Sequence, residues 1–336
     1  MTDRRGIELV PLRQLAVGPV DASFELHPGD RPLVAVGDRV ATGALLAERL
    51  RDARTIVVAG PRAGGEDDRP GSAWSAPPSK RAADGDAGPV GELLFQSGGR
   101  WRIGSGESTE SLAAPFAGVV REVRPGIGLR LEGPAHGVRG MEALGSATTG
   151  RLVIATGPDG ELRAPQVDVG AAGAILVAGA RIDAEALTRA RAVGVRGIVV
   201  AALGLKERRD FLASEQRGRA GAHGLPAFAI LILDGTARRP IAGPVMDALR
   251  ALEGRTVAIV ADPPCVVVDD SSVALPAPAT DVVRIRSGPL AGAEGHWLGL
   301  AGPRRFPGGV ILEAGYVRLG DRSPVAVPIG DLERFS

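Results

Sequence analysis

The sequence is poor in cysteine, in aromatic residues and in long hydrophobic runs. One cysteine in 336 residues excludes a disulfide framework and any site built from several cysteine ligands. Aromatic residues make up only 3% of the chain, so its cores must be packed with aliphatic side chains. No apolar run reaches the about 18 residues of a transmembrane helix, and the first residues lack the apolar stretch of a signal peptide. We therefore expect a cytoplasmic protein without membrane insertion.

Positive and negative charges are nearly balanced in the sequence. The 40 basic and 39 acidic residues give a net charge of +1, which argues against a general nucleic-acid coat but leaves room for a local basic surface. The basic residues are nearly all arginine, with Lys80 and Lys206 as the only lysines and no asparagine at all. GC-rich codon usage explains this bias more simply than thermophily does. The arginines are therefore not a phosphate-binding signature by themselves.

Catalytic motifs are absent from the sequence as well. It contains no phosphate-binding loop of the form G-x-x-x-x-G-K-[ST], no H-E-x-x-H and no G-x-S-x-G. The four histidines are scattered, and the adjacent Asp269 and Asp270 are more simply solvated than bound to a cation. Cys265 lies in an apolar stretch and is expected to be a buried thiol. We predict no catalytic residue, no metal site and no cofactor, which favours a binding protein over an enzyme.

Composition and periodicity predict a multi-domain protein that combines α/β and all-β folds. An N-terminal β domain is expected over residues 1–150, with a flexible insertion over 59–91 that is too rich in Gly, Pro, Ser and Asp to bury a core. A short hairpin around Ser97 follows the insertion. Strands alternate with helices over residues 151–270, which predicts a parallel sheet covered by helices. A Pro-rich linker leads to a small β domain over residues 279–336.

The two segments that flank the insertion form a recognisable pair. Val36-Gly37-Asp38-Arg39-Val40 precedes it, and Ala114-Pro115 with Gly118-Val119-Val120 follows it. The pair resembles the barrel-sandwich hybrid of biotinyl and lipoyl domains, and more closely the lysine-free version in Rnf-type electron-transport subunits. The resemblance implies the fold alone. No biotinyl or lipoyl group is expected, because Lys80 does not stand in the context of a modified lysine.

The middle domain carries clear helix signals. Asp183 is expected to cap a helix that ends at Gly194, and a polar helix is expected over residues 205–216. Pro244 opens a third helix that Gly254 ends. These helices separate four expected strands, over residues 174–178, 195–203, 226–233 and 255–261.

Two loops of this domain favour an anionic ligand. In parallel α/β sheets, ligands bind beyond the carboxyl ends of the strands. The loops after the second and third expected strands carry cationic side chains and a threonine, which suit a phosphate or a nucleic-acid backbone. A solvated pair of charged loops is the simpler alternative. The candidates are Lys206, Arg208, Arg209, Thr236, Arg238 and Arg239.

The segment over residues 282–295 has the most specific pattern in the chain. It alternates apolar and polar residues, turns at Gly288-Pro289, and has glycines at Gly292 and Gly295. The pattern resembles the KOW motif of NusG-type transcription factors and several ribosomal proteins. This resemblance implies an SH3-like barrel that binds RNA, ribosomal proteins or RNA polymerase. The long loop over residues 299–308 and the absence of lysines depart from the RNA-binding versions.

The resemblance also implies a set of contact residues. Arginine pairs with phosphate, and an aromatic ring can stack on a base. Alternatively, Trp297 and Tyr316 are core aromatics and the arginines form a solvated face. The candidates are Arg284, Arg286, His296, Trp297, Arg304, Arg305 and Arg318.

We therefore expect a non-enzymatic adaptor or binding protein that contacts RNA, a ribonucleoprotein or a protein complex through its C-terminal barrel. The sequence has no DNA-specific motif. One alternative is an enzyme, or a subunit of an enzyme complex, that binds a small anionic ligand in the α/β domain. Another is a structural assembly protein that docks through an apolar patch. The adaptor hypothesis predicts that Arg284→Glu with Arg286→Glu weakens RNA binding and leaves the fold intact.

Overall fold

The structure is a computed structural model, and over the residues that it describes three α-helices and several β-sheets make up most of the regular elements. This confirms a multi-domain fold that combines α/β and β parts. The expected flexible insertion over residues 59–91 lies outside the described residues, as does Lys80. The described residues are 6–26, 30–51, 54–58, 93–97, 100–105, 108–219, 227–269 and 273–336.

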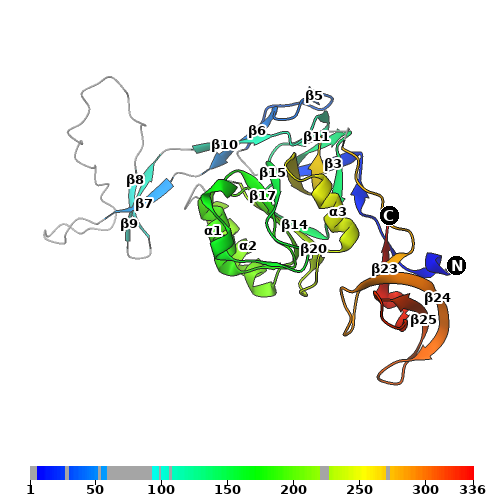
Figure 1. Ribbon diagram of the computed structural model, residues 1–336. Coiled ribbons are helices and arrows are strands. Elements are labelled where there is room, and N and C mark those ends of the chain that lie inside the picture. The colour runs from blue at the N-terminus through cyan, green and yellow to red at the C-terminus, as the bar shows by residue number, and fades with distance from the viewer. Residues whose placement is uncertain are drawn as a thin grey trace.

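A nine-stranded mixed sheet occupies the centre of the molecule (Figure 1). Three of the expected strands are parallel neighbours: β17 (Ala174–Val177), β19 (Gly197–Ala202) and β20 (Ala229–Gly235). The fourth parallel strand is β15 (Thr148–Ile154), which was not among the expected strands. The expectation that residues 255–261 extend this parallel arrangement is wrong, because β21 (Thr256–Ala261) runs antiparallel to β15.

Helix α3 (Gly243–Ala251) leads the chain into β21 at the edge of the sheet where β15 ends. The Leu152 amide donates to the Arg255 carbonyl, and the Gly254 amide donates to the Leu152 carbonyl, each at 2.9 Å. The chain therefore does not return to the edge where the parallel strands begin before β21 starts. Strand β21 then continues into β22 (Pro264–Val268) as an antiparallel neighbour.

The same sheet contains strands from the first 150 residues. Strand β14 (Glu142–Gly145) pairs with β20 at one edge. At the other edge, β13 (His136–Arg139) pairs with β22 and with β2 (Ala16–Val17). The nine-stranded sheet therefore extends across the expected boundary between residues 150 and 151.

The helices of this part begin and end at the expected signals. The Asp183 side chain accepts a hydrogen bond from the Ala186 amide at 2.5 Å and caps α1 (Ala184–Val193). Gly194 ends α1 with a φ of 92°, a left-handed conformation that favours glycine. Helix α2 (Leu205–Arg219) confirms the helix expected over residues 205–216.

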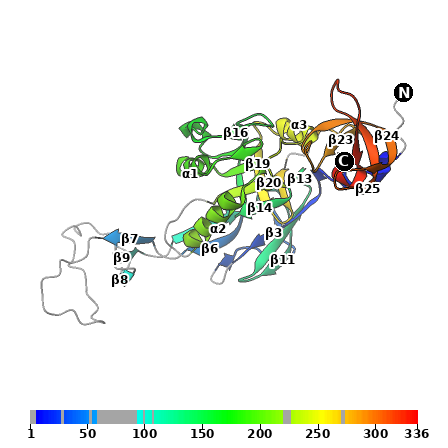
Figure 2. The same ribbon diagram turned by 90° about the horizontal axis from the view of Figure 1, so that it is seen from below.

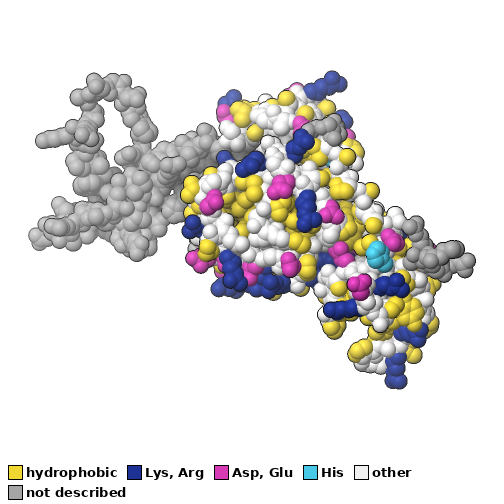
Figure 3. Space-filling view, in the orientation of Figure 1, with side chains coloured by type: hydrophobic (Ala, Val, Ile, Leu, Met, Phe, Trp, Pro, Cys, Tyr) yellow, Lys and Arg dark blue, Asp and Glu magenta, His cyan; other side chains and the backbone are white. Residues whose placement is uncertain are grey.

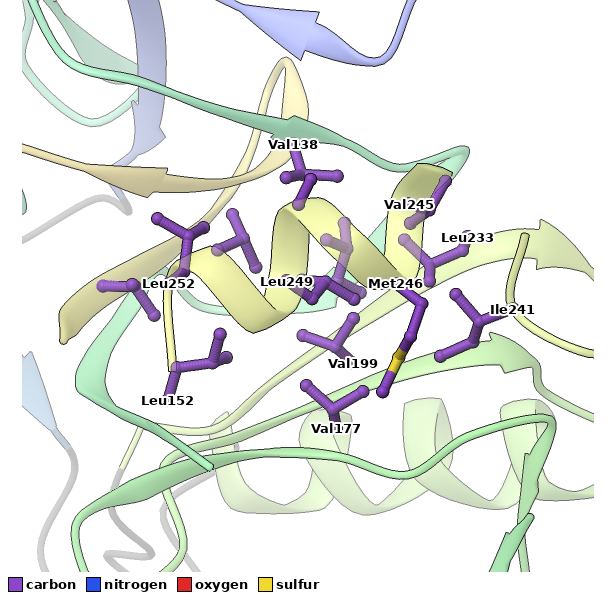
Figure 4. Close-up of a cluster of buried hydrophobic side chains, with 14 of the residues drawn as sticks. Val138, Leu152, Val177, Val199, Leu233, Ile241, Val245, Met246, Leu249 and Leu252 are labelled. Carbon is purple, nitrogen blue, oxygen red and sulfur yellow. The ribbon is translucent and has the colours of Figure 1, made fainter. Parts of the chain in front are cut away.

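Helices cover both faces of the central sheet. Because successive strand residues point to opposite faces, Ile175 and Val177 pack in the core under α3, while Leu176 packs in the core under α1 and α2. Figure 4 shows the first of these cores, in which Leu249 of α3 lies above Val199. Full burial of each such aliphatic side chain contributes roughly 1.5–3 kcal/mol. Cys265 is buried too, as expected.

The two segments that flank the insertion meet in space. Val40 pairs with Gly118 and Arg39 with Val119, and the Gly37 amide donates a hydrogen bond to the Val120 carbonyl at 2.8 Å. The four-stranded sheet around this contact has the order β3-β12-β11-β5, and a three-stranded sheet has the order β10-β6-β4. The bounds of these strands are Val20–Glu25 (β3), Arg31–Pro32 (β4), Arg39–Val40 (β5), Leu45–Arg51 (β6), Ser108–Ala113 (β10), Gly118–Arg124 (β11) and Gly128–Gly133 (β12).

The hairpin expected after the insertion is present. Strand β8 (Leu93–Ser97) pairs antiparallel with β9 (Arg100–Ser105), and β7 (Arg54–Val58) pairs with the other edge of β9. A small parallel pair, β16 (Glu161–Leu162) and β18 (Arg181–Ile182), lies between the larger elements of the α/β part.

A six-stranded sheet, named here the C-terminal sheet, lies beside α3 (Figure 2). Its order is β1-β27-β23-β24-β25-β26, so a strand from the N-terminus pairs with the last strand of the chain. Val10, Trp297 and Val317 pack in its core. The strand bounds are Leu12–Arg13 (β1), Val282–Ile285 (β23), Glu294–Arg305 (β24), Ile311–Arg318 (β25), Val325–Pro328 (β26) and Leu332–Phe335 (β27).

Candidate binding surface of the C-terminal sheet

Two of the seven expected contact residues lie inside the molecule. Trp297 is fully buried in the core of the C-terminal sheet, where a Cβ atom added to Gly315 would lie 2.0 Å from the indole ring. Arg284 is 1% exposed. No external partner can reach either side chain in this structure, so the expectation that Arg284 and Trp297 form part of a contact surface is corrected.

Arg284 is buried because it bonds to the α/β part of the molecule. Its Nη2 atom donates to Asp234 Oδ2 at 2.9 Å and to the Pro240 carbonyl at 2.7 Å, and its Nη1 atom donates to Glu333 Oε1 at 3.2 Å. Arg13 Nη1 donates to the second oxygen of Asp234 at 2.5 Å. Since Asp234 follows directly from the buried part of β20, these bonds fasten the C-terminal sheet to the central sheet.

The opposite charges in this buried site stabilise the ionised forms of Asp234 and Arg284. Burial alone would raise the pKa of Asp234, but the hydrogen bonds and charges of Arg284 and Arg13 outweigh burial and lower it. Burial would likewise lower the pKa of Arg284, and the hydrogen bond and charge of Asp234 raise it instead. Both groups therefore remain ionised inside the molecule.

A further carboxylate joins the C-terminal sheet to α3. Glu294 Oε1 accepts a hydrogen bond of 2.7 Å from the amide of Gly243, the first residue of the helix. Burial raises the pKa of Glu294, as do the charges of Asp247 and Glu333, while the Gly243 amide and Arg284 oppose that shift. We name the five charged residues at this junction the interdomain ion cluster: Arg13, Asp234, Arg284, Glu294 and Glu333.

The other five expected contact residues are exposed. The Arg286 side chain is 52% exposed and lies 3.9 Å from Glu333. His296 is 61% exposed and lies 3.2 Å from the Asp281 carboxylate. Arg304, Arg305 and Arg318 are also exposed.

Four of these exposed residues lie on a single hairpin, formed by β24 and β25. His296 and Arg318 are direct cross-strand neighbours at its base, and Arg304 and Arg305 lie at the end of β24. The guanidinium of Arg304 lies 5.6 Å from the ring centroid of Tyr316 and donates a hydrogen bond to its hydroxyl at 2.6 Å. The structure therefore gathers these four residues along one two-stranded element.

The end of this hairpin extends beyond the sheet, and we name residues 303–313 the arm. Strand β26 pairs only with Ala314–Val317, so it does not reach the arm. Figure 1 shows the hairpin pointing away from the α/β part, and Figure 3 shows basic and hydrophobic side chains together at that end. Phe306 is half-buried, and all other arm residues are exposed.

The arm carries aliphatic residues that were not among the expected contact residues. Val310, Ile311 and Leu312 are 53%, 67% and 42% exposed. In the sequence they are indistinguishable from an ordinary buried strand. The two glycines before them, Gly308 and Gly309, were the available signal of a hairpin turn.

Two of the five cationic residues expected to bind an anion have carboxylate neighbours. Arg208 pairs with Glu142, and Arg209 lies 3.7 Å from Asp210. The loops that carry them are neighbours, because the Leu203 amide donates to the Gly235 carbonyl at 3.0 Å. Of the remaining candidates, Lys206, Thr236 and Arg238 are exposed and Arg239 is half-buried.

A cavity of about 370 Å³ lies elsewhere, between the N-terminal strands and the ends of β21 and β22. None of the six anion candidates lines it. Within the described ranges, no group of three or more His, Cys, Asp or Glu side chains is arranged to hold a metal ion. The residues lining the cavity are Thr42, Pro115, Arg255, Thr256, Val268 and Asp269.

No protein-family model matches the chain, and no curated protein is significantly similar to it in sequence. Among the helices of the described residues, none combines the length and the apolar character needed to cross a membrane. Function must therefore be argued from the chain's own residues.

Proposed function

We propose that the chain is a non-enzymatic adaptor whose C-terminal domain, an SH3-like barrel of the KOW type, contacts RNA within a ribonucleoprotein complex. One observation carries the proposal: His296, Arg304, Arg305 and Arg318 are exposed along one hairpin. Arginine side chains bind phosphate groups, and such contacts position a nucleic acid without requiring a particular sequence.

The dimensions of the hairpin suit a nucleic-acid strand. Seven residue steps separate Ile311, which is paired with Arg305, from Arg318 at the base. In an extended strand these steps span about 24 Å, which matches about seven nucleotides of a stacked strand. The arginines therefore lie at the two ends of a segment long enough to meet several phosphates.

The interdomain ion cluster supports an adaptor role. An adaptor that holds two partners in a fixed relation needs a rigid junction between its domains, and Arg284 with Glu294 provides bonds from the C-terminal sheet to β20 and α3. The N-terminal strands add a second β part, for which we propose the barrel-sandwich hybrid fold because Gly118 pairs with Val40.

The enzyme alternative lacks a comparable observation. Arg208 and Arg209, two of the cations expected to bind an anionic substrate, have carboxylate neighbours. The loop before α3 also bonds across the strand ends, because the Ile241 amide donates to the Pro158 carbonyl at 2.8 Å. We therefore place the binding function in the C-terminal domain.

A pull-down of the tagged full chain from its native lysate, with and without nuclease, tests this proposal. We expect ribosomal or polymerase subunits to be recovered without nuclease and lost after nuclease treatment. Arg304→Glu with Arg305→Glu should reduce that recovery, whereas Arg322→Glu, which changes an exposed arginine in the turn after β25, should not. Recovery of a single metabolic complex that is indifferent to nuclease would contradict the proposal.

A further inference from the structure

RNA binding accounts for the arginines of the arm but not for its aliphatic residues. Val310, Ile311 and Leu312 are consecutive and all exposed, with Ile311 at 67% the most exposed of the three. Such side chains gain nothing from a phosphate backbone. Contiguous exposed apolar side chains are typical of surfaces that bind a partner with apolar groups.

The aliphatic residues lie on both faces of the arm. Successive residues of a strand point to opposite faces, and directly opposed residues of two antiparallel strands share a face. Arg304 is opposed to Leu312, so these two share one face, and Arg305 shares the other face with Ile311. Each face therefore combines one guanidinium group with one aliphatic side chain.

The order of the residues along the arm is also informative. The turn at the tip contains Phe306, Pro307 and Val310, and the Phe306 amide donates to the Val310 carbonyl at 2.9 Å. The two pairs of arginine and aliphatic residues come next. Glu313, the only acidic residue of the arm, lies one step farther from the tip, opposite Pro303. Along the backbone, the order from the tip is therefore apolar residues, then arginines opposed to aliphatic residues, then Glu313.

We propose that the tip of the arm inserts into the surface of an anionic lipid bilayer. Interfacial protein segments enter the boundary between headgroups and acyl chains by about 5–10 Å. The Arg305 guanidinium lies over the tip, since its Nη2 atom is 3.5 Å from the Cβ position of Gly309, and there it can pair with lipid phosphates. The Arg304 guanidinium lies farther from the tip, where it donates to the Tyr316 hydroxyl. Glu313 then remains in water. This inference goes beyond the proposed function, because it gives the arm a second partner.

A bilayer fits the arm better than the other classes of partner. It surrounds an inserted tip on every side, so both faces are covered, whereas a flat protein surface covers only one. A nucleic-acid groove would also surround the arm, but it would place Ile311 and Leu312 against polar base edges. Charge complementarity is provided by Arg305 at the tip and, from farther along the hairpin, by Arg304.

Flotation of the full chain with vesicles tests the inference. Vesicles of phosphatidylcholine alone serve as the neutral reference, and vesicles that also contain phosphatidylserine provide the anionic surface. We expect binding to the anionic vesicles only, weakened by salt. Arg304→Glu with Arg305→Glu should weaken binding by at least ~30-fold, since each basic residue near such a surface changes binding about fivefold.

The contribution of the aliphatic residues to vesicle binding is tested by a separate variant with a matched control. Ile311→Asp with Leu312→Asp should abolish binding, and Val36→Asp, which alters an apolar residue of similar exposure (63%) in the N-terminal part, should leave it unchanged. Both changes are on the surface, so the thermal unfolding midpoint should stay close to that of the unchanged chain.

Each possible result decides the inference. Failure to bind anionic vesicles, equal binding to neutral vesicles, or equal loss in Val36→Asp would overturn it. A chain that binds RNA but not vesicles refutes lipid contact and leaves the proposed function standing. A chain that binds vesicles through the arm but does not bind RNA supports lipid contact and contradicts the proposed function.

Discussion

At the scale of single residues, Arg284 is the most consequential side chain in the molecule. It contacts the carboxylates of Asp234 and Glu333, whose side chains are 4% and 9% exposed. Removal of one partner from a buried ion pair leaves the other partner charged and desolvated, which costs several kcal/mol.

We predict that Arg284→Ala lowers the free energy of unfolding by about 3–5 kcal/mol. Arg318→Ala, which removes an exposed arginine of the same sheet, should change it by no more than about 0.5 kcal/mol. Guanidinium-induced unfolding, followed by circular dichroism, measures both values. A similar small effect for the two variants would show that the interdomain ion cluster does not hold the domains together.

The burial of Arg284 changes what the double variant Arg284→Glu with Arg286→Glu would measure. Arg284→Glu would place a fourth carboxylate beside Asp234, Glu294 and Glu333, and the structure predicts that the fold would not survive it intact. The Arg286 side chain is 52% exposed, so Arg286→Glu alone still tests RNA binding without disturbing the fold.

The sequence could not have revealed this role of Arg284. The alternation Val283-Arg284-Ile285 correctly separates two faces of a strand, but a period of two does not say what covers the second face. Here the covering group is Asp234, which is 50 residues away in the chain and belongs to another domain. Trp297, by contrast, could be recognised as a candidate core residue, because large aromatic side chains dominate small cores.

The single cysteine gives a second prediction at this scale. Burial raises the pKa of Cys265 to about 12, against the opposing charge of Arg139. The thiol also donates to the Pro263 carbonyl at 3.2 Å. Because the thiolate is the reactive form, the native chain should react with iodoacetamide at least ~100-fold more slowly than the unfolded chain at neutral pH. Mass spectrometry of timed samples measures the rates, and rapid labelling of the native chain would contradict the burial.

At the scale of secondary-structure elements, the burial of Glu294 between the C-terminal sheet and α3 makes stability depend on pH. The pKa of Glu294 is raised above its ordinary value of 4.5, so the folded chain binds this proton more tightly than the unfolded chain. Its contribution to stability therefore grows as the pH falls through the raised pKa. The pKa of Asp234 is lowered, so its contribution is lost only as the pH falls below its ordinary value of 3.8.

We predict that Glu294→Gln removes part of this pH dependence. The free energy of unfolding of the unchanged chain should rise, relative to that of the variant, as the pH is lowered from neutral towards about 5. The difference between the two chains isolates Glu294 from the other titrating groups. Chemical unfolding at a series of pH values measures it, and parallel curves would rule out a raised pKa at this position.

The positions of helices and strands were more predictable from the sequence than the directions of the strands. Asp183 and Gly194 mark the ends of α1 because a side-chain cap and a left-handed glycine are local requirements. The direction of β21 depends instead on the edge of the sheet at which the chain enters the strand. Hydrogen bonds that join Leu152 to Gly254 and Arg255 set that edge, and strand–helix alternation alone does not show it.

At the scale of the whole molecule, the two ends of the chain meet in one sheet. Leu12 pairs with Arg334 and Arg13 with Phe335, and Figure 1 shows the termini on the same side of the molecule. A division of the sequence into consecutive domains cannot show such a contact, since β1 precedes the last strand by more than 300 residues. The same strand supplies Arg13 to the interdomain ion cluster, so the first strand, the central sheet and the C-terminal sheet form one connected unit.

The binding surface was predictable in part. The resemblance of residues 282–295 to the KOW motif drew attention to His296, Arg304, Arg305 and Arg318, which the structure places on one hairpin. The resemblance did not predict the exposed arm, because the exposure of the arm depends on β26 ending at the level of Ala314.

The central claim is that this hairpin binds RNA, and fluorescence anisotropy of a labelled single-stranded RNA titrated with the full chain tests it most directly. We expect a dissociation constant on the order of 10⁻⁵ M and a logarithmic salt slope of about −2 to −3, from three or four phosphate contacts. Combined Arg304→Glu, Arg305→Glu and Arg318→Glu should abolish binding, while Arg322→Glu should leave it unchanged. Absence of RNA binding by the unchanged chain, or equal binding by the triple variant, would contradict the account.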